Sequence, residues 1–523
     1  MASPTPLTAI AIRGDRIVYA GSDAGADPWV AVGTRVVDLR GRMVLPGFRD
    51  THAHPATGGI EQAGCLLDDL ETVSAVVEAI AGCVQRARPG SWIRGSGWAL
   101  PLFPEANPHK DLLDAVAPDH PVILVAADGH SAWANSRALQ AAGIDRSTPD
   151  PPNGRIMREA GSGEPSGTLR ESAVRLITRQ LPAYTQDEWK AGIQTALRMA
   201  NRFGITTIHE AALLPETLAA YASLDAHDAL TARVVAALFV DAGLGVAQVD
   251  SFISVREQYP ATPFFRVNSA KIMADGVIES GTAALLAPYV GTSSLGTANF
   301  RPGQLDSLAA ALDAASFRIH IHTIGDRAIR MSLDALAYAR RQNGPSDARP
   351  ILAHIQLFDP ADIPRFAAEG IIGSFQSLWA YADTYVTDLT EPVLGPERSR
   401  WLYPIASLAA TGATVVGGSD WNVSSMNPLD AIQVGMTRTA LSDTTGPPWI
   451  PEERVDLTTL LRMYTINAAY AAGDEQENGT LEVGKLADIV VLERDLYQTP
   501  PAEIHTVPVA LTIVGGKVVY EME

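Results

Sequence analysis

The 523-residue chain has only two cysteines, Cys65 and Cys83. Two cysteines are too few for a disulfide framework, and their spacing matches no zinc or redox motif. The N-terminus has no basic region followed by an apolar core, and no stretch reaches the roughly 18 uninterrupted apolar residues that a membrane helix needs. We therefore expect neither export nor membrane insertion, and a reducing cytoplasm fits best.

The chain is also poor in basic residues. It carries 40 Lys and Arg against 59 Asp and Glu, so its formal net charge is −19. Nucleic acid and anionic membrane surfaces both require a basic face, so neither is expected as a partner. Hydrophobic residues make up 46% of the chain, which is ample for the core of a soluble globular protein.

An apolar run that begins at Val44 ends on two histidines, His52 and His54. Side chains alternate faces along an extended strand, so these two imidazoles would point to the same side and could bind one ion. A pair with this spacing can equally occupy a polar turn, so the pair alone does not establish a metal site.

Further apolar runs contain or end on a side chain that could bind a metal. These side chains are Lys271, His320, His322, His354 and Asp420. Histidines scattered at random would not be expected to fall at strand ends so often. The recurrence strengthens the prediction of a metal site.

From residue 186 onward, helical segments alternate with apolar strands. Counting the run at Val44, eight strands are predicted, the other seven at 204–210, 233–239, 267–273, 317–322, 351–355, 371–375 and 414–418. Apolar strands alternating with helices indicate a parallel sheet, and eight of them indicate a closed (β/α)8 TIM barrel. Active sites in this α/β fold lie at the carboxyl ends of the strands, where all these candidates fall.

Both ends of the chain carry short strand-like pieces separated by turn signals. Neither end has enough strands to form a core alone, so we predict one small β-sandwich domain built from residues 1–44 and 476–523. The barrel would then span residues 45–475. A long insertion follows its first strand at about 56–185, and a connection of this length is usually functional or a subdomain.

The ordered set of candidates resembles the amidohydrolase superfamily, with His-x-His after strand one, Lys after strand four, His after strands five and six, and Asp after strand eight. The segments at 271–276, 322–328 and 418–420 resemble the branch that contains N-substituted formamide deformylases. The long insertion, with its Asp-Gly-His-Ser segment at 128–131, fits that branch too. A strand usual for the family is missing before Leu7, which a truncated or misassigned start would explain.

The resemblance implies the metal ligands residue by residue. His52 and His54 would hold one ion, His322 and His354 a second, and Lys271, carboxylated on its amine, would bridge them. Nitrogen and carbamate oxygen ligands suit zinc, although manganese, iron and cobalt are also accepted. One or two divalent ions are therefore expected, with zinc first among the candidates.

The resemblance also implies that Asp420 is both a ligand and the catalytic base. The metal would lower the pKa of its bound water to about 7, and Asp420 would take the proton and pass it to the departing amine. The structural alternative for Lys271 is an unmodified interior lysine paired with Asp275 or another carboxylate. His320 is expected to pack or to hydrogen-bond a ligand rather than to ligate.

Five residues near strand ends or in the insertion are predicted to contact a substrate. They are Asp128, His130, Trp98, Glu210 and Trp379. Each has a structural alternative: His130 could cap local structure, Glu210 could orient the ligands, and tryptophans are more often in a core.

We therefore predict a metal-dependent hydrolase that cleaves a non-peptide carbon–nitrogen bond in a small amide, N-formyl or N-acyl amine. A deaminase with one metal is the nearest rival, but such enzymes carry a glutamate three residues after the strand-five histidine, where this chain has Gly325. A non-catalytic barrel that serves as an assembly subunit is the rival from another class. The partner is a small molecule; a large barrel often pairs, so a homo-oligomer stays open.

Overall fold

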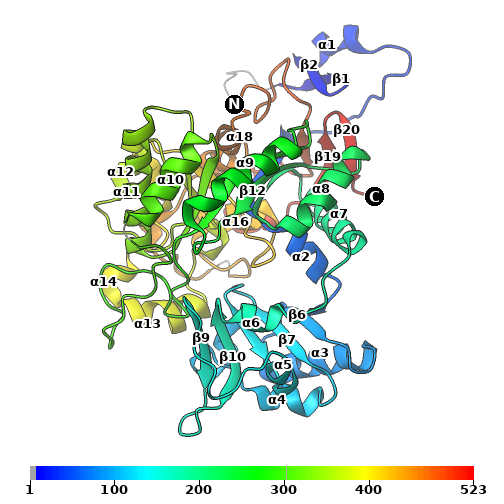
Figure 1. The fold of residues 1–523 in the computed structure, drawn as a ribbon. Coiled ribbons are helices and arrows are strands. Elements are labelled where there is room, and N and C mark those ends of the chain that lie inside the picture. Colours follow the sequence, from blue (N-terminus) through cyan, green and yellow to red (C-terminus); the bar gives the residue numbers. More distant parts are fainter. Residues whose placement is uncertain (1–6, 302, 444) are drawn as a thin grey trace.

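A parallel eight-stranded barrel forms the centre of the protein in the computed structural model, which describes residues 7–301, 303–443 and 445–523 (Figure 1). The strand order is β17-β16-β15-β14-β13-β12-β11-β4, and each neighbouring pair is parallel. The strands are β4 (Phe48–Ala53), β11 (Ile205–Leu213), β12 (Arg233–Phe239), β13 (Phe265–Met273), β14 (Arg318–Thr323), β15 (Ile351–His354), β16 (Ile372–Phe375) and β17 (Val415–Gly417). The predicted α/β class and eight-stranded barrel are confirmed.

Hydrogen bonds from β4 to β17 and to the loop after β17 bring the two outer strands of this sheet together. Thr51 Oγ1 donates to the Gly417 carbonyl at 2.9 Å, and Asp420 N donates to the His52 carbonyl at 2.7 Å. The sheet is therefore nearly closed, with the first and last strands side by side. This closure brings the histidine pair and Asp420 to one place.

Helices cover the outside of the barrel. They are α7 (Gln186–Arg202), α8 (Pro215–Ala226), α9 (Val249–Gln258), α10 (Gln304–Ala314), α11 (Asp326–Asn343), α12 (Ile363–Glu369), α15 (Ile405–Ala410), α16 (Pro428–Thr437), α17 (Leu457–Met463) and α18 (Ile466–Ala472). Helix α7 shows why the sequence forms them: Thr185 and Glu188 make a capping box, and Trp189, Ile193 and Ala196 recur on its buried face. Because helices cover the outside, the strands are buried on both faces, as their apolar sequences predict.

The boundary of the first barrel strand differs from the prediction. The run at Val44 forms β3 (Met43–Pro46), which pairs with β18 (Ile489–Leu492) in another sheet, and the barrel strand begins only at Phe48. Between the two strands, a Cβ on Gly47 would lie 2.2 Å from Thr206 Cγ2. The close approach at this glycine allows one apolar run to serve two sheets.

Strands near the N-terminal and C-terminal ends of the chain lie in the same region of the structure (Figure 1). Strands β3, β18, β19 (Val509–Val514) and β20 (Lys517–Glu521) form an antiparallel sheet, and β1 (Ala9–Arg13) and β2 (Arg16–Gly21) form a separate pair. The pair is tied to the C-terminal segment by a hydrogen bond of 2.9 Å from Ile17 N to the Lys485 carbonyl. Composite β structure from both ends is thus present, while its description as a sandwich stays a prediction.

The insertion after the first barrel strand folds around its own sheet, drawn in cyan in Figure 1. The strand order is β5-β6-β7-β8-β10-β9, and parallel and antiparallel pairs are mixed. Its strands are β5 (Cys65–Leu66), β6 (Ile93–Trp98), β7 (Val122–Ala126), β8 (Ser131–Ala134), β9 (Gly154–Arg158) and β10 (Pro165–Glu171). Its helices are α3 (Val73–Arg86), α4 (Lys110–Val116), α5 (Ser136–Ala141) and α6 (Val174–Thr178), and α2 (Pro55–Glu61) leads into it from the barrel.

Cys65 and Cys83 are joined by a disulfide inside the insertion. The two cysteines lie on β5 and α3, and packing of this helix against the sheet brings their Cα atoms to 5.8 Å. That separation falls in the normal range for a disulfide. The sequence did not predict this disulfide, and a cytoplasmic location stays a prediction.

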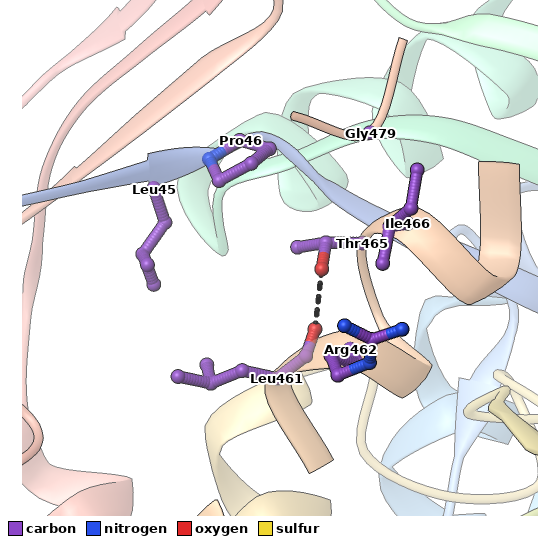
Figure 2. A pocket seen from close by; sticks show the side chains of 7 residues that line it. All are labelled: Leu45, Pro46, Leu461, Arg462, Thr465, Ile466 and Gly479. Atoms are coloured by element: carbon purple, nitrogen blue, oxygen red, sulfur yellow. Dashed lines mark hydrogen bonds between the residues drawn. The ribbon is translucent and has the colours of Figure 1, made fainter. Parts of the chain in front are cut away.

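A small cavity lies where β3 meets α17 and α18 (Figure 2). In this view Thr465 Oγ1 donates to the Leu461 carbonyl at 2.6 Å. None of the predicted site residues lines this cavity.

Within the described parts of the chain, no helix combines the length and apolar character needed to cross a membrane.

Candidate metal centre

The histidine pair and Asp420 meet where β4 ends beside the loop that follows β17. Two backbone hydrogen bonds of 2.7 Å fix this loop: Asp420 N donates to the His52 carbonyl, and His54 N donates to the Trp421 carbonyl. As a result, Asp420 Oδ1 lies 3.4 Å from His52 Nε2 and 3.1 Å from His54 Nε2. One carboxylate oxygen therefore faces both imidazoles.

Asp50 holds the two strands at this separation. Its Oδ1 accepts from the backbone N–H groups of His52 and Ser419, each at 3.0 Å, and its Oδ2 accepts from Ser419 Oγ at 2.5 Å. Burial raises the pKa of Asp50 to about 6. A Cβ on Gly418 would lie 2.7 Å from His52 Cβ, so the small residue there permits the close approach.

Lys271 and His354 complete the inner cluster. Lys271 Nζ lies 3.0 Å from His52 Nε2, and the His52 and His354 rings are 4.6 Å apart. Burial lowers the pKa of Lys271 to about 7, although the negative charge of Asp420 opposes the shift. A lysine with this pKa is partly neutral near pH 7, and only the neutral amine can react with carbon dioxide.

The hydrogen bonds of each imidazole indicate which nitrogen is left for an ion. His52 Nδ1 is 2.9 Å from His320 Nε2, which leaves His52 Nε2 toward Lys271 and Asp420. His354 Nδ1 is 2.9 Å from the amide oxygen of Gln376, which leaves Nε2. Outer hydrogen bonds of this kind fix ring orientation and tautomer at metal sites.

The inner residues suit a divalent metal. His52, His354 and Asp420 each offer a ligand atom, and these atoms lie within 4.8 Å of one another. Burial lowers the pKa of both histidines well below its usual value, so both are neutral, as ligands must be. Asp420 Oδ1 is buried without a hydrogen-bond partner among the described residues. Two imidazoles and a carboxylate are a donor set that zinc and related metals accept.

His354 and Asp420 also have backbone conformations that non-glycine residues rarely adopt. Their φ angles are 72° and 55°, in the left-handed region. Such conformations cost on the order of 1 kcal/mol and cluster at functional sites. The backbone therefore supports the assignment of both residues to the site.

His322 lies beside this cluster, with its ring 4.5 Å from that of His354. Its Nε2 donates to the Gly276 carbonyl at 3.2 Å, which leaves Nδ1 for an ion. Ligation by His322, and with it a second metal position, stays a prediction. His320, by contrast, hydrogen-bonds the His52 ring, the alternative that the sequence favoured over ligation.

The insertion brings His130 next to the candidate metal ligands. The His130 ring is 5.3 Å from the ring of His322, and Asp128 Oδ1 accepts from His130 N at 2.9 Å. Burial alone would lower the pKa of His130, but the carboxylates of Glu171, Asp128 and Asp420 outweigh it and raise the pKa to about 9. A pKa of about 9 makes His130 a cation at neutral pH, beside His322.

The other predicted substrate contacts differ in their placement. Trp379 is partly buried and stacks on His354, with ring centroids 5.7 Å apart and an interplanar angle of 2°. Glu210 accepts from Tyr221 Oη at 2.6 Å and from Ala56 N at 3.1 Å, so it holds the start of α2 next to His54. The structure does not bring Trp98 to the cluster, because its fully buried ring belongs to the core of the insertion.

Three residues of the site were not found from the sequence. Asp50 and Gln376 hydrogen-bond the ligand candidates His52 and His354, and Glu171 binds the His130 ring. Asp50 could have been suspected from its place two residues before His52. Gln376 and Glu171 gave no local signal, because each meets its partner only through the sheet pairing of distant segments.

Comparisons with known proteins bear on the family and the fold. The sequence model described as the amidohydrolase family matches residues 35–520. Protein LONG AFTER FAR-RED 3 of Arabidopsis thaliana is 31% identical over 98% of this chain and 88% of its own length. N-substituted formamide deformylase of Arthrobacter pascens is 28% identical over 98% of this chain and 95% of its own. A solved structure of an uncharacterized metal-dependent hydrolase from Pyrococcus horikoshii OT3 has a TM-score of 0.74 at 20% identity, covering 94% of each chain.

Proposed function

Because the chain belongs to the amidohydrolase family, we propose that it hydrolyses the carbon–nitrogen bond of a small N-acyl or N-formyl amine. The observation that carries the proposal is the buried cluster of His52, His354 and Asp420, with Lys271 beside it. The formamide deformylase of Arthrobacter pascens supports the N-formyl amine as a first substrate to test.

The residues that would hold one or two metal ions are His52, His54, a carboxylated Lys271, His322, His354 and Asp420. The neutral imidazoles of His52 and His354 and the unpartnered Asp420 Oδ1 fit a divalent transition metal, with zinc as our first choice. When bound, such a metal supplies an acidified water and polarises a carbonyl oxygen.

Asp420 would act as the base that moves the proton. Its Oδ1 faces the histidine pair and has no other partner among the described residues, so it can accept a proton from a water held there. The carboxyl can then give the same proton to the nitrogen that leaves, which avoids release of an unstable amide anion. Trp379, stacked on His354, would supply an apolar wall for the acyl group.

The packing around Gly325 argues against the deaminase alternative, which would need a glutamate at this position. A Cβ at this position would lie 2.0 Å from the Ala284 carbonyl oxygen, and Gly325 N donates to Asp275 Oδ2 at 2.9 Å. A glutamate side chain at residue 325 would require the backbone of a neighbouring segment to move. The glycine is therefore part of the local packing, and the acid that a deaminase would place there does not fit.

The test is hydrolysis of a panel of N-formyl and N-acyl arylamines by the zinc-loaded protein, with release of the arylamine measured by absorbance. We expect at least one N-acyl arylamine to be cleaved and the rate to disappear after exhaustive chelation and return with zinc. Equal activity before and after chelation would contradict the metal dependence. Release of ammonia from aminated heterocycles without cleavage of any acyl amine would favour the deaminase instead.

A further inference from the structure

Two consecutive residues at the end of β10, Arg170 and Glu171, dock the insertion onto the barrel. Arg170 is buried, and its Nη1 donates to Ser280 Oγ at 2.9 Å. Glu171 Oε1 accepts from Thr282 Oγ1 at 2.7 Å. Ser280 and Thr282 belong to the segment that follows β13, the strand that carries Lys271. The insertion is therefore anchored next to the candidate metal ligands rather than at a remote surface.

The second oxygen of Glu171 holds His130. Glu171 Oε2 accepts from His130 Nδ1 at 3.0 Å, and Glu171 N donates to the His130 carbonyl at 2.8 Å. The φ angle of Glu171 is 51°, in the left-handed region that costs a non-glycine residue on the order of 1 kcal/mol. Both the ring and the backbone of His130 are thus fixed by one residue that lies 41 positions away in the sequence.

Gly276 leaves the space that Glu171 occupies. A Cβ at this position would lie 2.3 Å from Glu171 Oε1 and 2.2 Å from Thr282 Oγ1. The carbonyl of the same glycine accepts from His322 Nε2 at 3.2 Å. One residue therefore contacts the carboxylate that holds His130 and the imidazole of a predicted metal ligand. These contacts fix the position of His130 relative to His322.

We propose that Glu171 is a positioning residue for His130, and that His130 Nε2 donates a hydrogen bond to the carbonyl oxygen of the bound acyl group. Because Nδ1 is engaged by Glu171, Nε2 is the ring nitrogen left for a ligand, and no described residue hydrogen-bonds to it. The His130 ring lies 5.3 Å from that of His322, within reach of a substrate at the metal. The role in catalysis rests on the proposed function; the binding of an oxyanion does not.

The insertion also offers a matched control pair. His109 Nε2 lies 3.4 Å from Glu159 Oε1, in a pair whose side chains are 40% and 33% exposed. The test variants are H130A, E171A, E171Q and the double variant H130A/E171A. The controls are H109A and E159Q, which change the same residue types outside the site. Zinc content and thermal midpoint are measured for each, so that a misfolded variant is recognised.

The first readout is the Kd of methylphosphonate for the zinc-loaded protein, measured by titration calorimetry. This tetrahedral oxyanion has no cleavable amide, so its binding tests the site without turnover. We expect H130A and E171A each to weaken binding by about 10-fold or more, the usual size of a lost charge-assisted hydrogen bond. E171Q should lose less than E171A because its amide oxygen still accepts from Nδ1, and the controls should stay within about twofold.

The double variant separates positioning from a merely structural role. If Glu171 acts through His130, E171A adds no further loss in the H130A background. Equal losses from E171A in both backgrounds, or an unchanged Kd in zinc-replete H130A, would overturn the inference. The second readout is turnover of an N-formyl arylamine, where loss of one oxyanion donor lowers kcat by about 10²- to 10³-fold. Phosphonate binding that depends on His130 without hydrolysis of any acyl amine would refute the proposed function but not the site.

Discussion

Burial of Lys271 should leave its amine largely neutral, and so able to react with carbon dioxide, just above neutral pH. The lysine side chain is 1% exposed, and burial lowers its pKa from 10.5 to about 7. At pH 8 the neutral fraction is then about 0.9, against roughly 0.003 for a lysine with an ordinary pKa, an increase of about 300-fold. Only the neutral amine attacks carbon dioxide, so at equal dissolved carbon dioxide the carbamate should form about tenfold more slowly at pH 6 than at pH 8 in the metal-free protein.

The assay is carbon-13 NMR of metal-free protein supplied with labelled bicarbonate, followed by zinc titration. We expect one carbamate resonance that is absent from K271A, and zinc binding that weakens in carbon dioxide-free buffer. Short carboxylic acids should partly restore zinc binding to K271A by replacing the carbamate. Full zinc content and full rate in K271A, or tight zinc binding without carbon dioxide, would refute the bridging role and leave Lys271 as a structural lysine.

Three further results are expected. D420N should keep its fold and most of its metal but lose about 10²- to 10⁴-fold in rate, and more than a tenth of wild-type turnover would show that another group takes the proton. D488A should lower the free energy of unfolding, measured with urea, by about 3–5 kcal/mol, because it leaves the buried Arg233 guanidinium without its ion-pair partner. R35A, which breaks an exposed pair, should lower it by at most about 1 kcal/mol. Similar losses in the two variants would contradict this prediction. Burial raises the pKa of Glu61 from 4.5 to about 7, so the free energy of unfolding of the metal-free wild type should fall as the pH rises from 4.5 to 7. Over this range E61Q should become more stable than the wild type by up to about 3 kcal/mol. A difference between the two proteins that does not change with pH would contradict this.

The barrel could be predicted from the sequence because its strands are short apolar runs separated by helices with regular periodicity. The start of the first strand could not, because the run from Val44 is continuous across Gly47. Only the sheet pairing shows that Met43–Pro46 belongs with Ile489–Leu492 and that the barrel strand begins at Phe48. The disulfide was also beyond sequence reasoning, since the separation of Cys65 and Cys83 depends on how α3 packs on β5.

The site residues that could be predicted from the sequence are those at the carboxyl ends of barrel strands. The order of parallel strands places His52, Lys271, His354 and Asp420 at one rim, and the structure brings these residues together. Trp98 could not be placed, because a tryptophan in an apolar strand has the same sequence pattern whether it faces a core or a pocket. The partner of His130 depends on pairing between β8 and β10, which the sequence of the insertion did not indicate.

The most direct test of the metal centre is the anomalous difference map of a crystal of the zinc-loaded protein, recorded at the zinc absorption edge. We expect a peak between His52, His354 and Asp420, and a second peak near His322 if two ions bind. An active, zinc-replete protein whose only anomalous peaks lie away from these residues would contradict the assignment of the site.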